Sequence, residues 1–285
     1  MILTSLPVEY AAVRARLVDV EKHLLPSGLD ADIGRLGATA RQVVLVQVDP
    51  SGGGMAAAVS QSTRFFRPEA IVFVGLAAGL REDVAVGDVV VATRVYAYGG
   101  GEDTPEDTYA RPRAWHTSHR LTQVSRQAVR RAEDTWNWGV HFRAIAAADP
   151  RLSEPGAHAM AWLRRMSSDV AAVEMEASGL AHAAHVIDHM EVLTIRGISD
   201  VAGSSPGSGE RSTAQERAAA NAGTVAVAVL SELGLLGGER TDSEPSIHHA
   251  VYRGDHLDFR GGTFMGSVIG KVTGPIGSPH GDGQT

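Results

Sequence analysis

Two short segments place carboxylates beside predicted strand ends in otherwise apolar surroundings. Residues 173–177 read VEMEA and carry Glu174 and Glu176, and residues 195–200 read IRGISD and end on Asp200. Asp and Glu side chains are seldom fully buried without a partner, so acids in such a setting usually bind a ligand or react with one. Carboxyl groups can transfer protons and accept hydrogen bonds from hydroxyl groups. These segments therefore predict an active site that works by acid–base chemistry.

The elements that position these acids alternate between strands and helices up to about residue 233. The predicted strands are 2–5, 43–48, 71–74, 88–95, 141–147 and 191–198. The predicted helices are 8–20, 54–66, 117–134, 156–166, 176–188 and 212–233. Such alternation predicts an α/β fold with a largely parallel or mixed central sheet flanked by helices. The strands are mostly continuous apolar runs, which is typical of a sheet covered on both faces.

The candidate site residues follow strands that should end at one edge of this sheet. Glu9 follows the first predicted strand, residues 75–79 follow the third and Asp200 follows the sixth. Ligands in open α/β sheets bind beyond the carboxyl ends of the strands, so these segments are expected to converge on one crevice. The glycine-rich run 75–79 by itself is typical of a tight strand-to-helix turn. Its glycines would let the backbone approach a ligand closely, and Ala77 and Gly79 are candidate contacts.

Composition excludes several classes of function. The chain has 285 residues, of which 44% are hydrophobic and 21% charged, as in ordinary globular proteins. Its net charge of −7 argues against a broad nucleic-acid surface, and the absence of cysteine excludes disulfides and thiolate metal sites. No apolar run approaches the roughly 20 residues needed to span a membrane, and the N-terminus has no basic leader. We therefore expect a cytoplasmic protein with no nucleic-acid or membrane partner.

Four segments, in order along the chain, resemble the purine nucleoside phosphorylase/uridine phosphorylase superfamily, and most of all its methylthioadenosine/S-adenosylhomocysteine nucleosidases. They are residues 6–10, the turn 52–57, the run 74–80 with 86–90, and residues 173–176 with 196–200. The resemblance covers residues 1–233. It implies a single catalytic domain with the three-layer nucleoside phosphorylase-like fold, a homo-oligomer, and a small-molecule purine nucleoside or nucleotide as substrate. It requires no metal or organic cofactor.

The resemblance also implies roles for individual residues. Asp200, with Ser199 beside it, would deliver a proton to the purine, and Glu9 would position or deprotonate water. Glu176 would accept hydrogen bonds from the ribose 2′- and 3′-hydroxyls, and Met175 would pack against the sugar. Locally, Asp200 is equally typical of a helix cap, and Glu9 is typical of a first-turn acid that the helix dipole favours.

Some positions leave alternatives open. Glu174 is either an orienting group in the site or half of a structural ion pair, and Arg196 is expected to be a structural partner for one of the acids. Phosphorylases of this superfamily hold phosphate with arginine and serine around the glycine-rich run. The matching positions here are Phe73 and Leu76, whose side chains cannot bind an anion. Hydrolysis is therefore favoured over phosphorolysis.

Arg151 departs from the nucleosidase pattern. It lies in the loop after the fifth predicted strand, where the nucleosidases carry an aromatic residue that stacks on adenine. A guanidinium can stack on a base or hold a phosphate, and the second option would suit a nucleotide such as ATP. The alternative is that Arg151 points into solvent.

The C-terminal part of the chain changes in composition. Residues 234–246 are predicted as a linker, 247–274 as a short glycine-rich motif and 275–285 as a disordered end. Leu257 and Phe259 alternate with polar residues, and such segments can stack between identical copies. The motif resembles bacterial amyloid-signalling motifs, which implies self-assembly or a signalling partner. A disordered tail or a docked hairpin is the alternative.

Together these observations predict a purine nucleosidase that hydrolyses the N-glycosidic bond of an adenine nucleoside or nucleotide. A phosphate-dependent nucleoside phosphorylase is one alternative. The other is a nucleotide-binding signalling or defence effector that is recruited through its C-terminal motif.

Overall fold

The computed structural model describes most of the first 236 residues. The described ranges are 1–25, 28–37, 41–48, 54–98, 102–103, 108–109, 113–147, 157–174, 190–203 and 207–236. All of them belong to one unit, Met1–Gly238. The predicted helix at 176–188 and the predicted motif at 247–274 lie outside the described residues.

Strands and helices alternate along this unit. The strands are β1 (Ile2–Thr4), β2 (Leu17–Leu24), β3 (Asp30–Leu36), β4 (Gln42–Gln47), β5 (Ile71–Gly79), β6 (Val89–Ala97), β7 (Glu102–Asp103), β8 (Thr108–Tyr109), β9 (Arg113–His116), β10 (Val140–Ala147), β11 (Val170–Glu174) and β12 (Val192–Val201). The helices are α1 (Pro7–Arg14), α2 (Gly54–Phe66), α3 (His119–Ala132), α4 (Ala157–Met166), α6 (Ser208–Leu236) and the short 3₁₀ helix η1 (Glu133–Thr135).

The described strands form one ten-stranded mixed sheet in the order β11-β10-β6-β12-β5-β1-β4-β3-β2, with β9 beside β6 and a separate β7–β8 pair. β5 runs parallel to its neighbours β1 and β12, whereas β12 and β6 are antiparallel. β11 also pairs with β5, through Ala172 with Gly79 and Val173 with Ala78. The five strands β5, β12, β6, β10 and β11 therefore close on one another as a small barrel.

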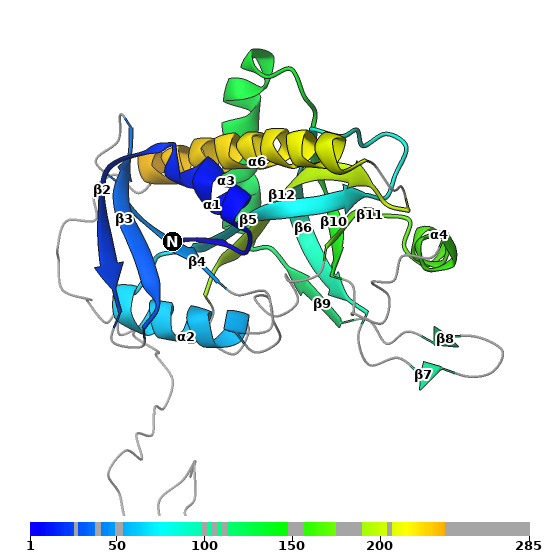
Figure 1. Cartoon of the computed structure of the whole chain (residues 1–285), viewed down its shortest axis with the longest axis horizontal. Coiled ribbons are helices and arrows are strands. Elements are labelled where there is room, and N and C mark those ends of the chain that lie inside the picture. Colours follow the sequence, from blue (N-terminus) through cyan, green and yellow to red (C-terminus); the bar gives the residue numbers. More distant parts are fainter. Residues whose placement is uncertain are drawn as a thin grey trace, which may run out of the picture. The chain divides into compact units, whose positions relative to one another are not determined.

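Helices cover both faces of the sheet (Figure 1). α1, α3 and α6 lie on one face, where Ile2 and Val72 of the sheet share a core with Val225 of α6. α2 lies on the other face, where Phe73 of β5 shares a core with Val59 of α2. Successive strand residues point to opposite faces, so a strand buried on both faces must be apolar throughout. This confirms the three-layer α/β architecture that the continuous apolar runs predict.

α6 lies directly on β12. A Cβ atom at Gly197 of β12 would stand 2.0 Å from the carbonyl oxygen of Ala218 in α6, so the helix backbone occupies the space of the missing side chain. This close approach fixes the position of the part of β12 that carries Arg196 and Asp200.

Several predicted elements differ from the structure. The predicted helix at 8–20 is wrong beyond Arg14, because residues 17–24 form β2, an edge strand with mostly exposed polar side chains. Neither β3 nor β11 was predicted. The run 75–79 is not a strand-to-helix turn but the second half of β5, and α6 extends to Leu236, into the predicted linker.

Candidate active site

Glu9 is locked in place by backbone donors from two elements. Pro7 begins α1, and its fixed φ suits a first helical position. Glu9, two residues later, turns its carboxylate back so that Oε2 accepts hydrogen bonds from the backbone N–H of Ser5 at 2.9 Å and of Leu6 at 2.8 Å. Oε1 accepts one from the N–H of Leu76 in β5 at 2.8 Å. Glu9 is thus both a first-turn acid and a buried carboxylate that ties β1 to β5.

The environment of Glu9 favours holding a proton. Glu9 is only 1% exposed, and this burial raises the pKa of its carboxyl group above the ordinary value of 4.5. The guanidinium of Arg196 and the three backbone donors act in the opposite direction, by favouring the ionised form. A carboxylate with a raised pKa is better matched to proton transfer near neutral pH than an ordinary glutamate.

Arg196 is buried between two acids. Its Nη2 donates to Oε2 of Glu174 at 2.5 Å, with both side chains essentially inaccessible to solvent. The guanidinium also lies 4.0 Å from the ring centroid of Phe73. A Cβ atom at residue 75 would stand 1.6 Å from Arg196 Nη1 and 3.0 Å from Glu9 Oε1, so only glycine fits there. Gly75 therefore allows close approach of Arg196, and the expected role of Arg196 as partner of an acid is confirmed.

Asp200 is the penultimate residue of β12 and lies beside a register shift. Ile198 pairs with Ala77 and Asp200 with Ala78, so Ser199 is the extra residue of a bulge, a feature that often redirects side chains next to active sites. The Ser199 hydroxyl is 2.9 Å from Asp200 Oδ1 and 3.5 Å from the carbonyl oxygen of Ala77. Ser199 is buried and Asp200 is half-buried. Ser199 thus donates to one oxygen of a carboxyl group that is partly exposed to solvent.

The described acids surround the end of β5. Glu9 follows β1 and Asp200 lies near the end of β12, and both strands are neighbours of β5 in the sheet. Glu174 ends β11, which reaches β5 through the closure of the barrel. The structure therefore brings together three of the predicted acids. Ala77 and Gly79 lie among them in β5, where the Gly79 carbonyl accepts from the N–H of Ala202 at 2.8 Å.

Three predicted site residues, Met175, Glu176 and Arg151, lie outside the described residues. Sequence reasoning missed the role of the Leu76 N–H, since a leucine carries no chemical signal. It also missed that Gly75 makes room for Arg196. The signal for Gly75 was its place in an apolar strand, where a glycine often marks a close backbone approach.

Asp88 and His141 form a separate polar pair that supports the fold. Asp88 accepts from the backbone N–H of Ala85 at 3.0 Å and of Gly139 at 2.8 Å, and its Oδ2 is 2.8 Å from His141 Nε2. Among the described residues, no group of three His, Asp or Glu side chains is arranged to hold a metal ion. No described helix is long and apolar enough to cross a membrane.

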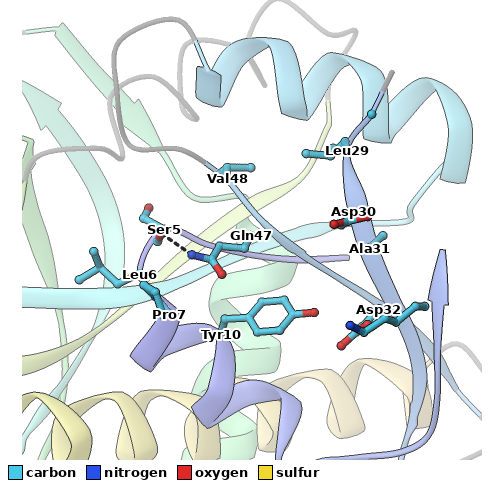
Figure 2. A pocket seen from close by; sticks show the side chains of 12 residues that line it. Ser5, Leu6, Pro7, Tyr10, Leu29, Asp30, Ala31, Asp32, Gln47 and Val48 are labelled. Carbon is cyan, nitrogen blue, oxygen red and sulfur yellow. Dashed lines mark hydrogen bonds between the residues drawn. The ribbon is translucent and has the colours of Figure 1, made fainter. Parts of the chain in front are cut away.

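A pocket of about 810 Å³ adjoins the segment that holds Glu9. Ser5 and Leu6 line it on one side, and residues of β3 and β4 line it on the other (Figure 2). Two of the three residues whose N–H groups bind Glu9, Ser5 and Leu6, are therefore shared between the acid cluster and the pocket.

Comparison with known proteins matches most of the chain. Residues 1–231 match the family model described as Phosphorylase superfamily. A 5′-methylthioadenosine/S-adenosylhomocysteine nucleosidase of Listeria monocytogenes is 29% identical over 209 residues, which cover 70% of this chain and 85% of the relative. The nucleosidase of the same description from Listeria innocua is 32% identical over 199 residues, covering 65% and 82%.

Solved structures share the fold. The methylthioadenosine/S-adenosylhomocysteine nucleosidase of Neisseria meningitidis, in complex with methylthio-immucillin-A, superposes with a TM-score of 0.66 at 22% identity, covering 80% of this chain and 96% of that one. The futalosine hydrolase of Helicobacter pylori superposes with a TM-score of 0.67 at 17% identity, covering 81% and 96%. Both likenesses confirm the fold that the four sequence segments predict.

Proposed function

The chain belongs to the phosphorylase superfamily, and we propose on that premise that it is a purine nucleosidase. Its reaction is hydrolysis of the N-glycosidic bond of an adenine nucleoside such as methylthioadenosine or S-adenosylhomocysteine, the compounds that name its relatives. The observation that carries the proposal is the placement of buried Glu9 shortly after β1 and of half-buried Asp200 near the end of β12, the two strands that flank β5.

The two acids have different roles in cleavage of the N-glycosidic bond. As the bond between C1′ and the purine breaks, positive charge builds on the ribose and negative charge on the base, as in glycoside hydrolysis. Asp200 donates its proton to the leaving purine. Glu9 accepts a proton from water, whose oxygen bonds to C1′ and completes the sugar product. Each step uses positioned general acid–base catalysis, which typically contributes about 10²–10⁴-fold.

The segment after β11 would supply the ribose contacts. Glu174 is anchored by Arg196, so the chain leaves β11 from a fixed point. We assign the ribose hydroxyls to Glu176 and the packing against the sugar to Met175, the next residues along the chain. Glu174 itself then serves as a positioning residue.

Water rather than phosphate is favoured as the nucleophile. Phe73 is fully buried beneath the Arg196 guanidinium, and Leu76 packs against Ala218 and Ala219 of α6. These two positions therefore present no anion-binding side chain, and Arg196 is already paired with Glu174. The relatives named above give no support to ATP as a substrate, so the proposal is confined to nucleosides.

The test is release of the free purine base by the purified protein, adenine or, from inosine, hypoxanthine, followed chromatographically. Methylthioadenosine, S-adenosylhomocysteine, adenosine and inosine are each offered with and without phosphate. We expect phosphate-independent release that is lost in Asp200→Asn and Glu9→Gln. Asp134→Asn, at an exposed acid of η1, is the matched control and should retain full activity. Strict phosphate dependence would make the protein a phosphorylase, and release that persists in Asp200→Asn would refute the assigned acid.

Two further features are proposed. We expect the enzyme to act in the cytoplasm and, as its family resemblance implies, to form a homo-oligomer. We also propose that residues 247–274 recruit it to an assembly, on the strength of their alternating apolar sequence.

A further inference from the structure

Two arginines near the ends of β5 and β12 donate hydrogen bonds to backbone carbonyls alone. Arg164 of α4 donates from Nε to the carbonyl oxygen of Leu80 at 2.9 Å and from Nη2 to that of Ala202 at 3.2 Å. Arg81, in the loop after β5, donates from Nε to the carbonyl oxygen of Val170 at 2.9 Å. Neither guanidinium has a carboxylate partner among the described residues. Their hydrogen bonds therefore hold segments of backbone together, and the reaction assigned above uses neither side chain.

The carbonyls that Arg164 binds lie where two neighbouring strands end. β5 ends at Gly79 and β12 at Val201, so Leu80 and Ala202 are the first residues beyond the two strands. A backbone hydrogen bond from the Ala202 N–H to the Gly79 carbonyl joins these segments at 2.8 Å. The Arg164 guanidinium bridges them one step further along the chain.

Asp200 depends on this strand end for its position. It pairs with Ala78, and Val201 pairs with Gly79, so only one further residue pair follows it before β12 ends. Pairing is also interrupted just before it, by the extra residue Ser199. The ends of strands open more readily than their centres, because fewer contacts hold them. A link placed immediately beyond Asp200 therefore limits the movement of its backbone.

The apolar face of α4 contacts the same two strand ends. The buried side chains of Trp162 and Leu163 share a core cluster with Leu80 and Ala202. Arg164, the next residue along the helix, binds the carbonyl groups of those two residues. Figure 1 shows α4 near the ends of these strands. The helix thus holds both the side chains and the backbone of the segments that follow β5 and β12.

Arg81 in turn holds α4. Its two Nη atoms donate to the carbonyl oxygen of Arg164 at 3.3 Å, and Nη2 also donates to that of Ser167. These carbonyls belong to the last turn of α4 and to the residue after it, where helix carbonyls lack intrahelical partners. The helix dipole also favours a cation at this end. Because Arg81 fixes the end of α4, Arg164 reaches the strand ends from a fixed support.

The two bonds of Arg164 require the geometry of a guanidinium. Nε and Nη2 lie on one edge of this planar group and donate in nearly parallel directions, so they suit two acceptors that lie side by side. The carbonyls of Leu80 and Ala202 are such acceptors, one beyond each strand. A lysine has a single nitrogen on a flexible stem, so it can bind either carbonyl but does not hold both in one fixed arrangement.

We propose that Arg164 is a positioning residue for Asp200. It ties the end of β12 to the end of β5 and so keeps the Asp200 carboxyl group directed at the leaving purine. Arg81 supports this role by fixing α4. The proposal rests on the proposed function, because it takes Asp200 as the acid of that reaction. If Arg164 were only a brace of the fold, its loss would lower stability and leave the rate of bond cleavage unchanged.

The first measurement separates bond cleavage from substrate binding. Arg164→Met removes both donors and keeps an aliphatic stem. In single turnovers with enzyme in excess, it should lower the rate of methylthioadenosine cleavage about 3- to 10-fold. The steady-state KM should stay within about twofold of the wild type, since the general acid acts in the bond-breaking step. Arg164→Lys should regain part of the rate. Arg165→Met, at the exposed neighbour on α4 that forms no hydrogen bond with the described residues, is the control and should keep the wild-type rate.

The second measurement reports on the strand end and requires no activity. Hydrogen exchange followed by mass spectrometry should show faster exchange of residues 198–203 in Arg164→Met, by at least about threefold. Residues 225–233 of α6, which belong to a different core cluster, should exchange as in the wild type. Arg81→Met should change both measurements in the same direction by a smaller factor. It takes the place of Arg164→Met if thermal melts show that the latter does not fold.

The outcomes distinguish this proposal from the proposed function. A lower cleavage rate and faster exchange in Arg164→Met, but not in Arg165→Met, support the positioning role. Faster exchange with an unchanged rate would show that Arg164 only braces the fold. Unchanged exchange, or an equal fall in rate in Arg165→Met, would also overturn the proposal. If the wild type cleaves no nucleoside, the proposed function fails, and exchange still decides whether Arg164 holds the end of β12.

Discussion

The guanidinium of Arg196 occupies the space that a side chain at residue 75 would fill. A Cβ atom on Gly75 would stand 1.6 Å from Nη1, well inside any permitted contact. The guanidinium therefore lies flat against the backbone of β5, from where it reaches Glu174 and favours the ionised form of Glu9. The missing side chain at residue 75 thus allows one buried cation to interact with two acids.

Gly75→Ala should disrupt this arrangement. The added methyl group displaces the guanidinium from Glu174, and overpacking of a buried site typically costs about 1–3 kcal/mol in free energy of unfolding. We expect a loss of at least that size, together with a drop in kcat/KM of more than tenfold. Denaturant unfolding and adenine release measure the two effects. Gly209→Ala, where nothing lies within 4 Å of the new Cβ, is the control and should be neutral or slightly stabilising.

Removing one partner of the buried pair should cost more than removing both. Arg196→Met leaves the Glu174 carboxylate buried and unpaired by its cation, which typically destabilises a protein by about 3–5 kcal/mol. Adding Glu174→Gln removes that charge, so the double variant should be at least about 1 kcal/mol more stable than Arg196→Met alone. A double-mutant cycle of unfolding free energies measures this. Simple additivity would show that the two side chains are not energetically coupled.

The pH profile of kcat/KM should have an acidic limb that reflects the ionisation of Glu9. Burial raises the pKa of this carboxyl above 4.5, and only its ionised form accepts a proton from water. As the pH falls through that raised pKa, kcat/KM should therefore decline with unit slope, and the decline should begin at a higher pH than for an ordinary glutamate. Loss of the nearby cation in Arg196→Met disfavours the ionised form and should move the limb to still higher pH. Arg196→Lys keeps the charge and should move it less; a limb that stays fixed in Arg196→Met would argue against Glu9 as its source.

Ser199→Ala tests the orientation of the acid. The hydroxyl lies 2.9 Å from Asp200 Oδ1, and without it the carboxyl group can rotate. We expect kcat to fall about tenfold, because positioning errors in general acid catalysis are costly, with less than about 1 kcal/mol change in stability. Thr213→Ala removes an exposed hydroxyl near the start of α6 that donates to the carbonyl oxygen of Gly209, and it should change neither quantity. A kcat unaffected in Ser199→Ala would mean that the bulge alone aims Asp200.

The catalytic unit should work without the C-terminal segment. Every described element lies within Met1–Gly238, so a chain ending at Gly238 should retain kcat/KM within about twofold. The full chain, but not the shortened one, should give a thioflavin response and sediment as fibrils. Identical behaviour of the two chains would remove the support for self-assembly through residues 247–274.

The edge of the sheet could be predicted because its signals are local. Apolar runs mark β1 and β12, and the acids near their carboxyl ends, Glu9 and Asp200, are visible in the sequence. The resemblance of four segments to a known superfamily supplied the roles expected of these residues. None of this required knowledge of which strands are neighbours.

What could not be predicted depends on contacts between distant segments. β2 reads as a continuation of α1 because its exposed polar side chains hide its pairing with β3. Ser199 can be identified as the extra residue of a bulge only when the register between β12 and β5 is known. Gly75 looked like part of a turn because the partner that needs its missing side chain, Arg196, comes more than a hundred residues later.

The seam between β11 and β5 bears on how the protein folds. It consists of two residue pairs, Ala172 with Gly79 and Val173 with Ala78, from segments about ninety residues apart. Contacts between such distant segments must offset a large loop entropy and form slowly. Glu174 is the next residue after this seam, so its ion pair with Arg196 forms only when the barrel closes. The acid cluster is therefore among the last features to assemble, and a partly folded chain should be catalytically inert.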